Sequence, residues 1–276
     1  MRQDQQARGG SVKTILRMAW RALVPILVLA VVHRADAQQA IGVLGQPALP
    51  GVEILITPYL WLPWTSLDIR PSDSRLSNAS ETIDPGKLIS HLTWVPFMGQ
   101  AEFRSGAFGL ITDYIHAPLK AGVGTRNILF NGAGAGLRLD TGSAVILYRT
   151  AALPDQYFDI GMGVRAWGVD GQISLNEGLV PSVTVSNGLS WADPLIGVRY
   201  HREFGNGFGA TAYGDVGGFG VGAHIDWQLI GTIDYALRPG IDLHAGFRTL
   251  NFNFTATRAK FDMNMYGPTI SATVHF

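Results

Sequence analysis

The sequence predicts an all-β fold, namely an antiparallel transmembrane β-barrel of about 12 strands, with about 10 as the alternative count. Three observations support this. Hydrophobic residues make up 47% of the chain and charged residues only 15%, whereas a soluble domain carries about 25% charged residues. No run approaches the ~18 consecutive apolar residues that a spanning helix needs. Long segments alternate apolar and polar residues, and a closed barrel is the other structure that satisfies its backbone inside a bilayer.

The N-terminus reads as a signal peptide. Three basic residues, Lys13, Arg17 and Arg21, precede an apolar run that ends at Val32, and Ala35-Asp36-Ala37 follows as a small-x-small cleavage pattern. The run is too short to span a membrane and suits the core of a signal peptide. An uncleaved anchor or a buried helix is the alternative. The expected organisation is a signal peptide over 1–37, a periplasmic N-terminal segment over 38–52 and a barrel over 53–276.

Charge and cysteine content exclude several functions. Six of the 21 basic and two of the 21 acidic residues lie in the leader, so the mature chain has a net charge of −4. The mature chain therefore lacks the excess of basic residues that would indicate nucleic acid as a partner. The chain has no cysteine, which rules out disulfides and thiolate metal sites.

The segment 223–238 shows the strand pattern most clearly. Its odd positions, such as Ile225 and Leu229, are apolar, and even positions such as Asp226 and Asp234 are polar. Side chains alternate across a strand, so one face is apolar and the other wet. Similar patterns and turn residues predict strands near 53–69, 74–83, 92–105, 107–119, 125–139, 141–151, 156–175, 186–204, 207–217, 222–238, 240–256 and 262–276.

Two regions leave alternatives open. Residues 125–151 fit two strands or one strand plus a loop. The stretch from Asp84 to His91 fits a short helix, with Asp84 as N-cap and Pro85 in the first turn. In contrast, Arg238-Pro239-Gly240 is a typical tight turn.

A soluble periplasmic β-domain has the same period, with its apolar face inward. Strand length favours the membrane barrel, because globular strands have a mode of about 5–6 residues and tilted bilayer strands need about 9–11. The polar face also carries few lysines. Aromatic residues cluster near strand ends, as in the interfacial girdles of barrels: Tyr59, Trp61, Trp64, Tyr157, Phe158, Trp191, Phe204, Phe208 and Phe276.

The last segment alternates and ends in Val274-His275-Phe276. It resembles the C-terminal signature of outer-membrane proteins of Gram-negative bacteria, whose last strand ends in an aromatic residue and is read by the barrel-assembly machinery. The resemblance implies a location in the cell outer membrane, with lipid and that machinery as partners. It assigns the assembly signal to Tyr266, Ile270, Ala272, Val274 and Phe276.

Four further stretches resemble a group of uncharacterised proteobacterial outer-membrane β-barrel proteins. The chain departs from the group at Ala166 and Ala223, where an aromatic residue and a serine are expected. The resemblance implies the barrel and no particular activity. The stretches are Thr57–Pro63, Phe158–Trp167, Trp191–Tyr200 and Gly214–Gly222.

Charged residues on the wet face are the candidate site. Acids and arginines are mixed there, which fits a paired network that fills a narrow barrel or a pore lining that selects solutes. The paired network is favoured. The predicted lumen-lining residues are Glu102, Arg104, Asp159, Arg165, Asp193, Arg199, Asp215, Asp226, Asp234 and Arg248.

No pattern specifies catalysis. The glycine run 217–222 lacks the Lys-Ser/Thr of a phosphate loop. His201, His224 and His244 share the wet face and, with Asp226, are candidates for a metal site or a catalytic pair, but polar filling of the lumen explains them better. Known barrel enzymes place a His–Ser pair towards lipid. The sequence therefore predicts no enzyme, no metal and no cofactor.

The leading functional hypothesis is an integral outer-membrane protein with a structural role, or a narrow passive pore for small solutes. One alternative is a lipid-modifying enzyme. The other is a surface-binding or adhesion barrel, for which 176–186 and 71–84 are the candidate outer loops.

Overall fold

A computed structural model describes residues 51–72, 79–86, 97–123, 133–175, 183–256 and 259–276. The predicted signal peptide 1–37 and most of the segment 38–52 lie outside them. In these ranges no helix is long and apolar enough to cross a membrane. Pro85 and Gly86 have helical conformation, and the rest of the predicted helix up to His91 lies outside the described residues.

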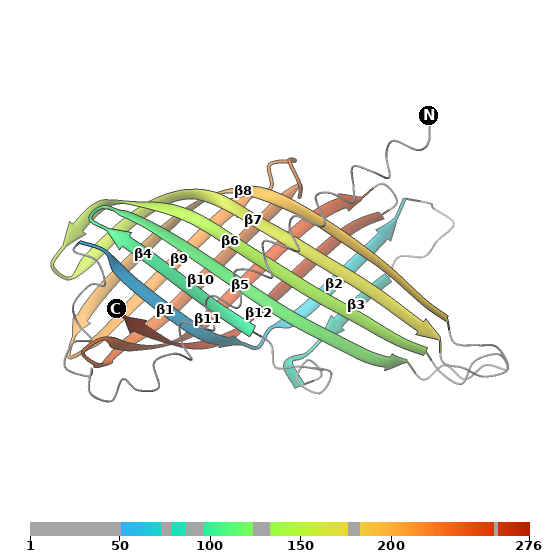
Figure 1. The fold of residues 1–276 in the computed structure, drawn as a ribbon, viewed down its shortest axis with the longest axis horizontal. Coiled ribbons are helices and arrows are strands. Elements are labelled where there is room, and N and C mark those ends of the chain that lie inside the picture. The colour runs from blue at the N-terminus through green and yellow to red at the C-terminus, as the bar shows by residue number, and fades with distance from the viewer. Residues whose placement is uncertain (1–50, 73–78, 87–96, 124–132, 176–182, 257–258) are drawn as a thin grey trace. The chain divides into compact units, whose positions relative to one another are not determined.

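Twelve strands make up the described fold, and all their pairings are antiparallel (Figure 1). Ten of them, β1 and β4 to β12, form a ring that closes through pairing of β1 with β12, which confirms the predicted fold class. The strands are β1 (Glu53–Trp61), β2 (Trp64–Pro71), β3 (Ala79–Ile83), β4 (Phe97–Ser105), β5 (Phe108–Val123), β6 (Ala133–Leu153), β7 (Gln156–Leu175), β8 (Val183–Gly205), β9 (Phe208–Gly217), β10 (Ile225–Arg238), β11 (Ile241–Ala256) and β12 (Ala259–His275).

The two strands outside the ring, β2 and β3, continue β1 and β4. The C-terminal half of β12 pairs with β1 and its N-terminal half with β2, so β1 and β2 follow one another along the same neighbour. Leu62 and Pro63 separate them. Proline has no N–H to donate to a ladder, which explains why the predicted single strand over 53–69 is two strands. Beside them, β3 pairs with β2 and β4 pairs with β1.

For residues 125–151, the prediction of two strands over 125–139 and 141–151 was wrong, and the alternative of a single strand is what the structure shows. One strand, β6, runs from Ala133 to Leu153 without a break at Gly142. Residues 125–132 lie outside the described residues. The loss of one predicted strand here and the gain of one at Pro63 leave the count of twelve unchanged.

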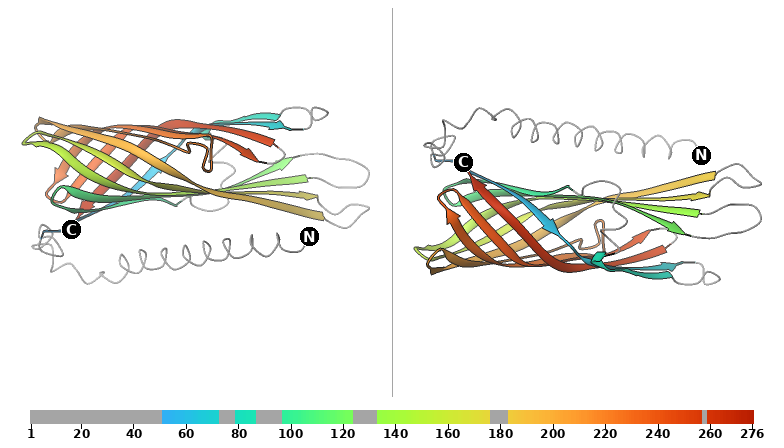
Figure 2. Two further views of the ribbon diagram at one scale, coloured as in Figure 1. Left: turned by 90° about the horizontal axis from the view of Figure 1, so that it is seen from above. Right: turned by 90° about the horizontal axis from the view of Figure 1, so that it is seen from below.

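Tight turns gather at one end of the barrel, which we call the short-turn end (Figure 2). Positive φ angles at Gly106, Asn206, Gly207 and Gly240 mark three of these turns. Because His275 N donates to Gly240 O, the end of β12 lies at the level of a turn. Both β1 and β12 therefore meet the short-turn end.

The outer face of the ring is apolar and the inner face is largely polar. On β10, Leu229 and Ile233 point outward and are 54% and 56% exposed, whereas Asp226 is fully buried. The predicted alternation therefore takes the orientation of a membrane barrel, with the apolar face outside. A soluble β-domain would bury that face.

The barrel interior has an apolar part that the sequence did not predict. Inward side chains from many strands pack into one cluster, which we call the apolar plug. It lies away from the short-turn end. Trp61 is the last residue of β1, and Trp167 of β7 pairs with Trp191 of β8 in the halves of these strands that are distant from that end. Its buried members are Trp61, Met98, Ile115, Leu139, Trp167, Leu250, Phe252, Met263 and Met265.

Candidate functional site

A cavity of about 510 Å³ occupies the interior between the short-turn end and the apolar plug. Gly205 and Gly207, at a turn of the short-turn end, belong to its lining. Glu53, Glu203 and Asp242 are three of the six acidic residues in its lining, which also holds four arginines. Glu53 and Asp242 both contact His275, at 3.2 and 2.8 Å.

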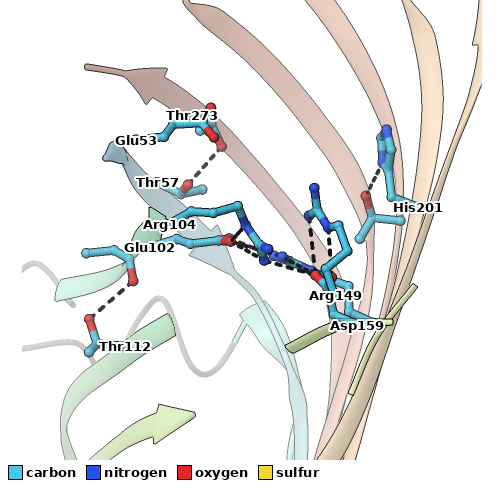
Figure 3. Close-up of polar contacts among 12 residues, drawn as sticks. Glu53, Thr57, Glu102, Arg104, Thr112, Arg149, Asp159, His201 and Thr273 are labelled. Atoms are coloured by element: carbon cyan, nitrogen blue, oxygen red, sulfur yellow. Dashed lines mark hydrogen bonds and ion pairs between the residues drawn. The ribbon is translucent and has the colours of Figure 1, made fainter. Parts of the chain in front are cut away.

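A first ion-pair cluster lies in the wall of this cavity. Arg199 binds Glu102 through Nη1 at 2.6 Å and Asp159 through Nη2 at 2.6 Å. Arg104 also binds both carboxylates, at 2.9 and 3.0 Å. Arg149 reaches Asp159 from β6 at 2.9 Å (Figure 3). Because three guanidinium groups surround two carboxylates, every charge here has an opposite partner despite burial.

A second ion-pair cluster lies against the apolar plug. Arg165, 2% exposed, donates from Nη2 to Asp215 at 2.7 Å and from Nη1 to Asp226 at 2.5 Å. Trp167, a member of the plug, donates from Nε1 to Asp226 at 3.1 Å. The nearby Asp193 accepts from Trp191 Nε1 at 2.9 Å. These bonds join the polar and apolar halves of the interior.

Arg248 forms a third buried group across the barrel. It donates to Asp113 on β5 at 2.6 Å and to Gln228 on β10 at 2.6 Å. It also donates to the hydroxyl of Tyr59 on β1 at 2.7 Å. The contacts between β11 and β5 bridge strands that are far apart in the ring, so side chains fill the lumen at this level.

Hydroxyl, imidazole and carboxylate groups form a chain of contacts along six neighbouring strands, which we call the polar belt. It runs from His201 on β8 through Thr211 on β9 to Asp234 on β10. It continues through His244 on β11 to Thr273 on β12 and Thr57 on β1. Figure 3 shows its two ends, with Thr57 beside Thr273 and His201 on the opposite wall. All six residues line the cavity.

The structure places all ten predicted lumen residues inside the barrel, each at most 8% exposed. It brings nine of them into the three ion-pair groups or the polar belt, and Asp193 stands beside the second cluster. Their role in solute passage remains a prediction. Sequence analysis missed Asp113, Arg149 and Thr273, although the parity of β5 would have placed Asp113 beside the inward Ile111 and Ile115.

The histidine grouping was partly wrong. His201 and His244 both contact Asp234, at 3.4 and 2.7 Å. His224 is exposed between β9 and β10, because the expected strand starts only at Ile225. Asp226 binds Arg165 and Trp167 instead of the histidines. No group of three or more His, Asp or Glu residues suited to a metal occurs in the described part of the chain.

The residues of the predicted assembly signal lie on the same side of β12. Tyr266 and Ile270 are exposed on the outer face, at 42% and 58%. Ala272, Val274 and Phe276 are half-buried, and Phe276 forms two backbone hydrogen bonds with Ile54 on β1. Their recognition by assembly machinery remains a prediction.

Comparison with known proteins gives the fold alone. No family model matches the chain, and no curated protein sequence matches it. Among solved structures, the outer-membrane protease OmpT from Escherichia coli is similar, with a TM-score of 0.53 and 7% identity over 82% of this chain and 97% of that one. The Ail protein of Yersinia pestis is matched with a TM-score of 0.31 and 10% identity over 82% of this chain and 99% of that one.

This comparison corrects one prediction. The sequence predicted that the chain is not an enzyme, yet the similar structure with a TM-score of 0.53 is a protease. The prediction was wrong because it took the absence of a lipid-facing His–Ser pair as grounds against catalysis. A barrel of this fold can be an enzyme, so the fold gives no ground to exclude an activity.

Proposed function

We propose that this chain is an integral outer-membrane protein whose lumen is closed to passive flow and whose cavity faces the periplasm. The sequence left two possibilities open, a barrel with a structural role and a narrow passive pore, and we propose the first. The observation that carries the proposal is the apolar plug above a cavity lined by paired charges. A barrel of about 8 strands is filled by its side chains and one of 16 leaves a channel, so ten strands are compatible with closure.

The turns support this orientation. Outer-membrane barrels have short periplasmic turns and longer outer loops. The turns at Gly106, Asn206 and Gly240 lie at the end where β1 begins and β12 finishes. That end would therefore face the periplasm, and the cavity that reaches Gly205 would open there. The apolar plug would face the cell exterior.

Export and assembly belong to the same proposal. Cleavage after Ala37 would make Gln38 the first mature residue, which mass spectrometry of the N-terminal peptide tests.

The half-buried Phe276 would serve the assembly machinery. Phe276→Ala should then reduce the share of protein that reaches the dense outer-membrane fraction and changes gel mobility on boiling. An unchanged share would argue against this role.

Planar-bilayer recording of the purified full chain tests closure. We expect no steady, discrete conductance from the native protein. The double change Trp167→Ala and Phe252→Ala removes two rings that pack at 4.7 Å inside the plug, and we expect it to introduce conducting events. A matched control, Phe108→Ala with Tyr148→Ala, removes an outward ring pair at 5.2 Å and should stay silent. Steady channels from the native protein would contradict the proposal.

A further inference from the structure

We propose that Thr273 is a nucleophile activated by His244 and oriented through Asp234, and that the cavity hydrolyses small esters. This inference goes beyond the closed barrel proposed above and does not depend on which side of the membrane the cavity faces. It begins from the polar belt, where a hydroxyl, an imidazole and a carboxylate stand in series on three consecutive strands.

The distances fit such a series. Asp234 Oδ1 lies 2.7 Å from His244 Nδ1, and His244 Nε2 lies 2.8 Å from Thr273 Oγ1. The register of the barrel produces this, because Asp234 pairs directly with His244 across β10 and β11. Nucleophile and base within about 2.6–3.2 Å, with the base held by a third group, is the arrangement that activates a hydroxyl.

The donors and acceptors among Asp234, His244 and Thr273 can be assigned from their chemistry. An ionised carboxylate only accepts, so His244 Nδ1 donates to Asp234, and when the imidazole is neutral its Nε2 is an acceptor. Thr273 must then donate its only proton to His244 Nε2. The second contact of Thr273, at 2.8 Å to Thr57 Oγ1, therefore has Thr57 as donor. This is the imidazole tautomer that a general base needs.

Further bonds hold Asp234 in place. Thr211 donates to its Oδ2 at 2.5 Å and Thr232 to its Oδ1 at 2.7 Å. The charged or titratable groups that contact it are His244 and, at 3.4 Å, His201. Asp234 is 7% exposed, so its orientation is set by the barrel and not by solvent. A fixed orienting group keeps the ring of His244 aimed at Thr273.

The chemistry balances without any other reactant than water. Thr273 Oγ1 attacks the ester carbonyl carbon while its proton passes to His244 Nε2. The tetrahedral intermediate loses the alcohol, which takes the proton from His244 as the C–O bond breaks, and an acyl-threonine remains. Water then attacks this ester with His244 again as base. The carboxylic acid leaves and the hydroxyl of Thr273 is restored.

The cavity limits the substrate. Its volume of about 510 Å³ admits a small ester and excludes a lipid with long acyl chains. Carboxylates outnumber guanidinium groups in its lining, where six acids (Glu53, Glu102, Asp113, Glu203, Asp234 and Asp242) accompany four arginines (Arg104, Arg149, Arg199 and Arg248). This excess of acids lowers the local concentration of anions. Neutral or cationic esters of small alcohols are therefore the class that we infer.

The test uses the full chain folded in detergent, with p-nitrophenyl acetate as the probe. We expect release of p-nitrophenolate and, after acid quenching, an acetyl group mapped by mass spectrometry to Thr273. Thr273→Val should abolish the label, and His244→Gln should lower the rate by about 100-fold or more, as loss of a general base does. Asp234→Asn should lower it as well.

Thr269→Val is the matched control. Thr269 lies on the same strand and lines the same cavity, but its hydroxyl donates to Leu60 O and not to a histidine. Its variant should keep both rate and label, and boiling shifts on gels verify that each variant is folded. Absence of an acyl group on Thr273, or equal rates in His244→Gln and the native protein, would overturn the proposal. The belt would then be structural, while the bilayer recordings would still stand or fall separately.

Discussion

Arg165 is the least exposed of the buried arginines in the described part of the barrel. It is 2% exposed and pairs with Asp215 and Asp226. Removing one partner from a buried ion pair leaves an uncompensated charge and costs about 3–5 kcal/mol. We therefore expect Arg165→Met to lower the free energy of unfolding by about that amount, measured by urea titration of tryptophan fluorescence in lipid vesicles.

The control for Arg165 is Arg70→Met. Arg70 pairs with Asp262 at 3.5 Å, but its side chain is 58% exposed. An exposed pair contributes about 0–1 kcal/mol, so this change should be nearly neutral. A loss for Arg165→Met no larger than that for Arg70→Met would mean that the second ion-pair cluster is not dry in the folded protein.

Alternation predicts which face a residue occupies but not which residue it meets. That is why the sequence placed Asp234 and His244 correctly on the inner face and yet grouped the histidines with Asp226. Partners across strands depend on the register, and the register depends on turns and bulges such as the one between Ala236 and Arg238. Thr273 was invisible for the same reason, since a threonine on a wet face carries no signal of its own.

At the scale of the strands, Gly267 of β12 packs directly against the break between β1 and β2. A Cβ at Gly267 would collide with Leu62 O and come within 2.8 Å of Pro63 Cα. Backbone atoms cannot give way as a flexible side chain does, and overpacking costs about 1–3 kcal/mol. Gly267→Ala should therefore lower the free energy of unfolding by at least about 1 kcal/mol and weaken closure of the ring.

Gly231 on β10 provides the comparison. A Cβ there meets nothing within 4 Å. Gly231→Ala should therefore be neutral or slightly stabilising, because alanine lowers the backbone entropy of the unfolded chain. Both variants are measured by the temperature at which the boiling shift on gels appears. Equal midpoints for the two would show that β12 does not pass close to the break.

Strand existence was readable from the sequence, and strand continuity was not. The apolar and polar faces of β10 follow directly from the residues. Whether Gly142 ends a strand, or Pro63 interrupts one, depends on the neighbours that pair with them. A glycine opposite Ala166 in a long ladder continues the strand because both flanking ladders hold it there.

For the whole molecule, the outer face and the inner face of the barrel differ in how far the sequence predicts them. The apolar exterior was predictable, because it repeats with period two along strands such as β10. The apolar plug was not, because its members Met263 and Met265 share the inner face with Thr269 and Thr273. Depth along the barrel axis decides which inner residues meet ions and which meet rings, and depth is a property of tilt and register.

Depth also gives the sharpest test that the apolar face meets lipid. Leu229 and Leu237 both point outward from β10 and are 54% and 52% exposed, but Leu237 lies beside the turn at Gly240. An arginine on the lipid face of a barrel costs about 2–4 kcal/mol at the bilayer midplane and about 0–1 kcal/mol near the interface. Leu229→Arg should therefore destabilise the barrel in vesicles far more than Leu237→Arg does. In water the two changes, at nearly equal exposure, would cost alike, so equal losses would mean that the apolar face is covered by something other than a bilayer.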